Sequence, residues 1–157
     1  MKTEIGIKPA NSAEVAQSLN GLLADEHVLY IKTRNAHWNV EGPDFLTIHR
    51  FFEEQYKEIE SIIDEIAERI RTIGHYAEAT LAGFLKETHL TEQTREKNNS
   101  SGFMKSLLDD HQAIIIRLRE NIDRYAEEWK DVGSSDFITG LLKTHEKMAW
   151  MLRAHLK

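Results

Sequence analysis

Residues 45–73 read FLTIHRFFEEQYKEIESIIDEIAERIRTI, and this stretch decides the fold. Apolar and aromatic residues recur in it at intervals of three and four, the spacing that places side chains along one side of an α-helix; they are Ile48, Phe52, Tyr56, Ile59, Ile63, Ile66 and Ile70. Asp44 stands where a capping side chain is expected, and Gly74 stands where a helix commonly ends. The stretch therefore predicts one long amphipathic helix from about Phe45 to Ile73.

Further helices are expected on both sides of this one. The same spacing predicts a helix over 12–39 capped by Asn11 or Ser12, a helix over 102–130, and a last helix that a turn at 133–136 caps and that ends near residue 155. Gly42 and Pro43 break the chain between the first two helices. The long connection 75–100 contains a short apolar run, 81–85, that predicts a small helix. Two short connections and one long one predict an all-α four-helix bundle with a crossover.

Composition bounds the class of protein. The chain has 157 residues, 41% of them apolar and 29% charged, which fits one folded domain spanning 1–157 with a short flexible tail at 1–11. It has no apolar run long enough to cross a membrane, and 1–11 lacks the apolar region of a secretion signal, so we expect a cytoplasmic protein. Cysteine is absent, so any metal ion must be bound by nitrogen and oxygen atoms.

Two pairs of potential metal ligands lie on the second predicted helix. His49 and Glu53 are four residues apart, as are Asp64 and Glu68, so each pair projects from one face. Imidazole with carboxylate suits Fe(II), Zn(II) or Mn(II). His37 adds a further candidate at the end of the first helix. The alternative is a purely structural bundle, in which these side chains are a solvated helix surface.

The spacing of the two pairs limits how they can act together. His49 and Asp64 are 15 residues apart, a separation of about 22 Å along a helix that rises 1.5 Å per residue. They cannot share a metal ion within one chain. Two copies of the helix packed antiparallel across a two-fold axis near Tyr56 and Lys57 would bring His49 of one copy to Asp64 of the other.

Several familiar motifs are absent from the sequence. Intra-bundle di-iron proteins carry Glu-x-x-His motifs, but no histidine here has a glutamate three residues before it. The zinc-protease pattern HExxH is missing because Ala149 stands where a second histidine would follow His145-Glu146. An ordinary metal site inside the bundle is therefore not indicated.

Two stretches of the chain resemble the signatures of the Dps family of miniferritins, which are ferritin-like proteins. The first is His37-Trp38-Asn39-Val40-Glu41-Gly42 followed by Phe45, His49 and Glu53; the second runs from Ile63-Asp64-Glu65-Ile66-Ala67-Glu68-Arg69 to Ile73-Gly74. The order and lengths of the predicted helices match over nearly the whole chain. The resemblance implies a ferritin-like bundle with a short helix in its long connection.

The same resemblance implies a function and a set of residues. Family members form a hollow homo-dodecamer built from two-fold dimers, with a ferroxidase centre at each dimer interface. Carried over, His37, His49 and Glu53 bind iron together with Asp64 and Glu68 of the neighbouring subunit. The expected reaction oxidises Fe(II), preferably with hydrogen peroxide rather than oxygen, and stores Fe(III) as mineral, which protects against oxidative damage.

Other roles stay open at the level of sequence. Trp38 matches a tryptophan beside the family's iron centre, where it either intercepts oxidising equivalents or packs at the dimer interface. Asp131 and Asp136 match the region of the family's acidic three-fold pores, although Asp136 can equally be a helix cap. Glu54, Glu58 and Glu65 are candidates for the mineral-bearing inner wall or for solvated exterior.

DNA binding is the main alternative function, because some family members bind DNA through a lysine-rich tail. Here the first twelve residues contain Lys2 and Lys8 against Glu4, and the net charge of the chain is −6. Binding to phosphates by release of counterions needs several basic contacts. We therefore expect DNA binding to be absent or weak, although twelve copies would multiply weak contacts.

Overall fold

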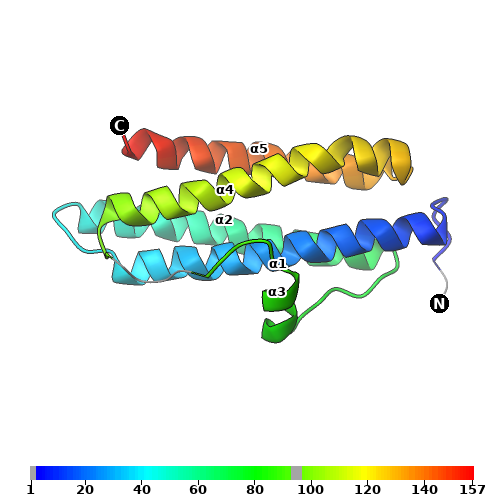
Figure 1. The fold of residues 1–157 in the computed structure, drawn as a ribbon, viewed down its shortest axis with the longest axis horizontal. Coiled ribbons are helices and arrows are strands. Elements are labelled where there is room, and N and C mark those ends of the chain that lie inside the picture. Colours follow the sequence, from blue (N-terminus) through cyan, green and yellow to red (C-terminus); the bar gives the residue numbers. More distant parts are fainter. Residues whose placement is uncertain (1–2, 93–96) are drawn as a thin grey trace.

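A computed structural model describes residues 3–92 and 97–157 of the chain. Its helices are, in order, α1 (Pro9–Asn39), α2 (Phe45–Thr72), α3 (Leu81–Glu87), α4 (Ser100–Asp123), the π-helical turn η1 (Arg124–Glu128) and α5 (Val132–His155). The four long helices lie side by side, and short α3 packs outside the bundle against α1 (Figure 1). The predicted all-α bundle with a short helix in its long connection is confirmed, and the architecture is that of a ferritin-like bundle.

The connections determine which helices run in the same direction. Helix α2 returns antiparallel to α1 after the short loop at residues 40–44 (Figure 1). The long connection that contains α3 then carries the chain back along the bundle, so α4 runs parallel to α2 and α5 returns beside α4. This arrangement places the end of α1 beside the start of α2, which is where the predicted histidines lie.

The first helix begins earlier than predicted. It starts at Pro9, whose ring suits the first turn of a helix because no backbone N–H is needed there. Asn11 and Ser12 are therefore inside the helix, and the Ser12 hydroxyl donates a hydrogen bond to the Pro9 carbonyl at 3.1 Å. The predicted cap was wrong, and the predicted tail 1–11 was too long by the first turn. Its first two residues lie outside the described part of the chain.

The boundaries of the last two long helices also differ from the prediction. Helix α4 begins at Ser100, where the Asn99 side chain accepts a hydrogen bond from the Gly102 N–H at 2.8 Å. Helix α5 begins at Val132, so the stretch at 133–136 that was predicted as a turn is helical. The cap of α5 is Asp131, whose carboxylate accepts from the Ser134 N–H at 2.9 Å.

Asp44 marks the start of α2 as predicted, but its side chain makes no capping hydrogen bond. Its carboxylate instead accepts from the Ser100 hydroxyl at 2.6 Å, and the Glu41 N–H donates to the Asn98 carbonyl at 2.8 Å. These contacts connect the α1–α2 loop to the start of α4. They limit the ways in which this loop can present the histidines on either side of it.

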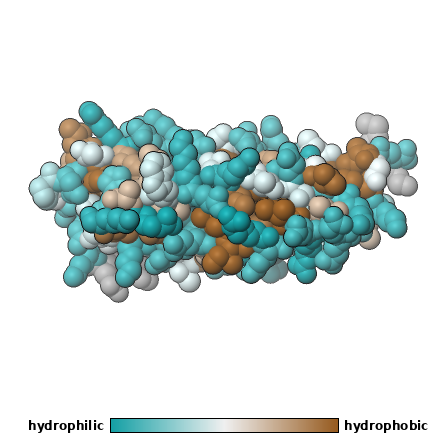
Figure 2. All heavy atoms as spheres, turned by 90° about the horizontal axis from the view of Figure 1, so that it is seen from above, coloured by the Kyte–Doolittle hydropathy of each residue, from teal (hydrophilic) through white to brown (hydrophobic). Residues whose placement is uncertain are grey.

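Most of the predicted apolar face of α2 enters the core, while Tyr56 and Ile63 at its edge are only partly buried. Ile48, Phe52, Ile59, Ile66 and Ile70 are each at most 3% exposed, in one core cluster with residues of α1, α4 and α5. In the described part of the chain, no helix is both long and apolar enough to cross a membrane. The face over α4 and α5 is largely hydrophilic with apolar patches (Figure 2); exposed apolar residues of α4 and α5 include Ile116, Val132 and Trp150.

Candidate metal centre

His37, near the end of α1, and His49, in the first turns of α2, face each other across the α1–α2 loop. Their rings stack with centroids 3.8 Å apart and planes inclined by 21°. The Nδ1 atom of His37 lies 2.7 Å from the His49 carbonyl oxygen, and Nδ1 of His49 lies 2.7 Å from the His37 carbonyl oxygen. Each histidine therefore binds the backbone of the other.

This reciprocal pairing determines which nitrogen of each ring is free. A carbonyl oxygen can only accept a hydrogen bond, so each Nδ1 must carry the proton and donate it. The neutral imidazole then leaves Nε2 with a lone pair, which is the form that binds a metal ion. Histidines in metal sites commonly have their second nitrogen held in this way by a backbone carbonyl. The structure presents two such ligands side by side.

Glu53 follows His49 by one helical turn on α2. Its Oε1 atom is 2.6 Å from Nζ of Lys57, an ion pair between an exposed lysine and a half-buried glutamate side chain. The hydrogen bond from Lys57 and the charge of Lys57 lower the pKa of Glu53, and the histidines His37 and His49 add smaller contributions against a desolvation penalty. Glu53 is therefore an ionised carboxylate close to the two histidines.

Asp64 and Glu68 are exposed near the far end of α2, and no hydrogen bond engages them within residues 3–92 and 97–157. In this same part of the chain, no three or more histidine, aspartate or glutamate side chains come close enough together to hold a metal ion. The structure thus divides the five predicted ligands into two groups, with His37, His49 and Glu53 at one end of α2 and the two remaining carboxylates at the other.

Trp38 is 62% exposed and lies beside Arg34, a residue that the sequence patterns did not single out. The guanidinium carbon of Arg34 is 4.8 Å from the centre of the Trp38 ring and 4.5 Å from that of Tyr56. Tyr56 in turn meets the His37 ring edge-on, with centroids 5.2 Å apart. A signal was present, because Tyr30, Arg34 and Trp38 are spaced four apart on α1.

The two aspartates predicted near a pore have different environments. Asp131 is 3% exposed and accepts hydrogen bonds from the N–H and the hydroxyl of Ser134, while Nη2 of Arg69 lies 3.3 Å from its Oδ1. It is a structural cap with a buried carboxylate. Asp136 is exposed one turn further along α5. The capping role that sequence reasoning allowed for Asp136 belongs to Asp131.

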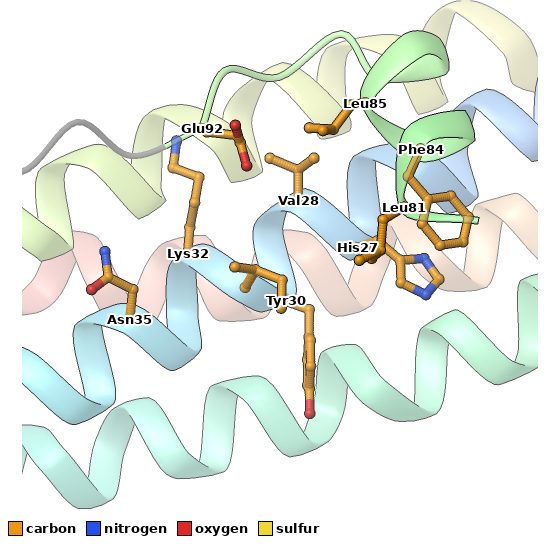
Figure 3. Close-up of a pocket in the computed structure, with 10 residues that line it drawn as sticks. His27, Val28, Tyr30, Lys32, Asn35, Leu81, Phe84, Leu85 and Glu92 are labelled. Carbon is orange, nitrogen blue, oxygen red and sulfur yellow. The ribbon is translucent and has the colours of Figure 1, made fainter. Parts of the chain in front are cut away.

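An apolar groove of about 450 Å³ lies between α1 and α3 (Figure 3). Its lining residues are His27, Val28, Tyr30, Ile31, Lys32, Asn35, Leu81, Phe84, Leu85 and Glu92. The His27 ring stacks on Phe84 at 3.8 Å, and Ile31, Leu81 and Leu85 are 56%, 77% and 52% exposed. Such contiguous exposed apolar surface is typical of an interface.

Comparisons with known proteins place this geometry in a family. The family described as "Ferritin-like domain" matches residues 16–157. A DNA protection during starvation protein of Bacillus anthracis is 37% identical over 91% of this chain and 97% of its own length. A low temperature-induced protein of Nostoc is 38% identical over 99% of this chain and 87% of its own length.

Solved structures give the same result. The Dps protein of Vibrio cholerae, described as a member of a broad superfamily of ferritin-like diiron-carboxylate proteins, superposes with a TM-score of 0.92 and 34% identity over 100% of this chain and 98% of that one. The Dps protein of Bacillus brevis gives a TM-score of 0.89 with 36% identity over 96% and 100%. The chain therefore belongs to the Dps family of ferritin-like proteins.

Proposed function

We propose that this protein oxidises Fe(II) and stores the Fe(III) product inside a cytoplasmic homo-dodecameric shell. Membership of the ferritin-like family supports iron storage and protection in general. The finer proposal is that each oxidation site is formed by His37, His49 and Glu53 of one subunit with Asp64 and Glu68 of the partner subunit.

One observation carries this proposal. The His37–His49 pair has both Nδ1 atoms hydrogen-bonded to backbone carbonyls, so two Nε2 lone pairs are free one helical turn from Glu53, although within the described residues these three side chains do not converge on one point. Two imidazoles and one carboxylate leave open coordination positions on a divalent ion. Nothing else in the described part of the same chain fills those positions. A second subunit that supplies two carboxylates would complete the site.

The apolar groove supports a partner subunit at this position. Ile31, Asn35 and Trp38 are three to four residues apart on α1, so they form one stripe from the groove to the histidines. Ile31 and Trp38 are more than half exposed in the single chain. A second copy that covers this stripe would bury apolar area and bring its own α2 to the site. The groove and the metal centre would then belong to one interface.

Iron is the substrate of the proposed reaction, and the ligand set suits it. Carboxylates offset the cost of stripping water from Fe(II) and stabilise the extra charge of Fe(III) more strongly, which favours loss of the electron. We propose that the protein uses hydrogen peroxide in preference to oxygen. The peroxide takes up the electrons from Fe(II) together with protons and is released as water. Consuming iron and peroxide together is the protective effect. We propose that Trp38, 62% exposed next to His37, either intercepts stray oxidising equivalents or packs at the dimer interface.

Entry and storage are proposed for other acidic residues. Asp136 is exposed in the first turns of α5 and remains a candidate for an entry pore, whereas Asp131 is already engaged within its own chain. Glu54 and Glu58 line a shallow groove between α2 and α5 and are candidates for the inner wall. With a net charge of −6 per chain, we propose that DNA binding is absent or weak.

A mixing experiment tests whether two subunits share the site. His49→Ala and Asp64→Asn should each abolish rapid peroxide-driven iron oxidation when expressed alone, because every site then lacks one ligand. When the two variants are co-expressed, random pairing makes about half of the dimers mixed, and each mixed dimer has one intact site of two. About one quarter of the wild-type rate should therefore return.

The controls separate this result from a loss of fold. Glu60→Gln changes an exposed carboxylate on the same helix and should leave the rate unchanged. Particle mass should show that every variant assembles. Co-expressed variants that remain as inactive as each variant alone would contradict a shared site, and unchanged rates in the single variants would contradict the ligand assignment.

A further inference from the structure

Glu26 of α1, His145 of α5 and His111 of α4 lie in the interior of the bundle, away from the candidate metal centre. All three are at most 1% exposed. The Nε2 atom of His145 is 2.8 Å from Oε1 of Glu26, and Nδ1 of His145 is 3.0 Å from Nδ1 of His111. The three side chains thus form one buried cluster with His145 in the middle, and this cluster connects three helices.

Charged residues around the Glu26–His145–His111 cluster form ion pairs with partners outside it. Asp25 of α1 pairs with Arg117 of α4 at 2.7 Å, and Lys32 of α1 pairs with Asp110 of α4 at 2.5 Å. On α5, Glu146 pairs with Arg119 at the surface. The buried side chains of α2 are uncharged. The Glu26 carboxylate therefore has His145 as its counter-charge.

The two contacts of His145 determine where protons can sit. A buried carboxylate 2.8 Å from an imidazole nitrogen favours a positive charge on that ring, and among the described residues neither Glu26 oxygen has a hydrogen-bond partner to stabilise it otherwise. Two Nδ1 atoms 3.0 Å apart also require one proton, donated by one ring and accepted by the other. A His145 imidazolium suits both neighbours, because its Nδ1–H can be donated to a neutral His111 and its positive charge lies 2.8 Å from Oε1 of Glu26, a contact that is an ion pair without hydrogen-bond geometry. Its positive charge matches the Glu26 carboxylate.

We propose that Glu26, His145 and His111 form a buried titratable cluster that binds one proton inside the bundle and makes the stability of the fold sensitive to acid. A second proton, on His111, would place two N–H groups face to face and leave one buried positive charge without a partner. Acid would therefore favour separation of α4 and α5 from α1.

The titration of His111 agrees with this geometry. Burial first, and then the charge of His145, lower the pKa of His111 well below the usual range. His111 is therefore neutral in the folded chain, while in the unfolded chain it takes up a proton below about pH 6.5. The unfolded state then binds more protons, so the free energy of unfolding falls as the pH falls below that value.

Proton uptake on unfolding provides the test. We would measure urea unfolding of the assembled protein between pH 5.0 and 6.5, with a chelator present, for the wild type, His111→Leu and Glu26→Gln. Relative to His111→Leu, the wild type should take up about one more proton on unfolding. For each unit by which the pH falls, its unfolding constant should therefore rise about tenfold more than that of His111→Leu. Glu26→Gln removes the counter-charge and leaves both histidines neutral in the fold, so it should take up about one proton more than the wild type.

His155→Gln is the matched control, because it removes an exposed histidine of α5 and should leave the slope of the wild type unchanged. A residue that only packs in the core would change the stability of a variant without changing its pH slope. Equal slopes in the wild type and His111→Leu would overturn the proposal. If His111→Leu does not assemble, a Glu26→Gln slope equal to or shallower than that of the wild type overturns it.

Discussion

In the single chain, the Lys57 ammonium group forms an ion pair with the Glu53 carboxylate, which we propose as a ligand of iron. The two side chains are 2.6 Å apart, and both are at least partly exposed to water, so they can separate at little cost. A metal ion that binds Glu53 must displace this ammonium group or share the carboxylate with it. Lys57 therefore acts as a competitor for one ligand of the site.

The substitution Lys57→Gln should raise the affinity of the site for a divalent ion. The increase should not exceed about fivefold, because exposed ion pairs contribute little. Zinc titration by calorimetry measures it without oxidation of the metal. Lys57→Arg keeps the charge and should bind zinc as the wild type does. Tighter binding by Lys57→Arg than by Lys57→Gln would contradict competition.

At this scale the sequence indicates which side chains are candidate metal ligands, but not how they are held. The spacing of His49, Glu53, Asp64 and Glu68 follows from the helical repeat alone. The reciprocal hydrogen bonds of His37 and His49 do not, because they depend on how the α1–α2 loop closes and on its contacts with the start of α4. Arg34 was missed because cation–π contacts leave a weak pattern in a sequence.

Among the helices, the most informative boundary is the start of α5. Asp131 caps this helix, binds Ser134 twice and receives Arg69 from α2, so one buried carboxylate connects two helices. Sequence reasoning found the long helices because their apolar repeat extends over many turns. It misplaced the start of α1 because that helix begins at Pro9 without a side-chain cap. It misplaced the start of α5 because a single capping contact from Asp131 decides that boundary, and several nearby polar residues could supply it.

Asp131→Ala should destabilise the fold by about 2 kcal/mol, through loss of the cap and of the partner of Arg69. Asp136→Ala, one turn further along and exposed, should cost less than about 0.5 kcal/mol. Urea unfolding of both variants measures the difference. Equal costs would contradict the structural role of Asp131. Because Asp136→Ala keeps the fold, it is also the variant whose iron uptake can report on a pore.

On the scale of the whole molecule, the single chain carries the two groups of proposed ligands at opposite ends of α2, and an apolar groove lies between α1 and α3. Spacing alone predicted that one chain cannot close the site. It could not predict the groove, because that surface forms where α3 from the long connection packs on α1. The groove and the proposed ligand His37 both lie along α1, so a partner subunit that covers the groove would also reach the metal centre. Assembly and iron oxidation should therefore depend on each other.

Ile31→Glu tests that dependence without touching a proposed ligand. The charge would lie in the groove, where burial against a second copy carries a large desolvation penalty, so the protein should release monomers. Ile116→Glu places the same charge at a similarly exposed position on α4 and should keep at least the dimer. Particle mass and the rate of peroxide-driven oxidation, measured together, should fall together in Ile31→Glu. Monomers that oxidise iron at the wild-type rate would show that one subunit suffices, and intact dimers of Ile31→Glu would place the interface elsewhere.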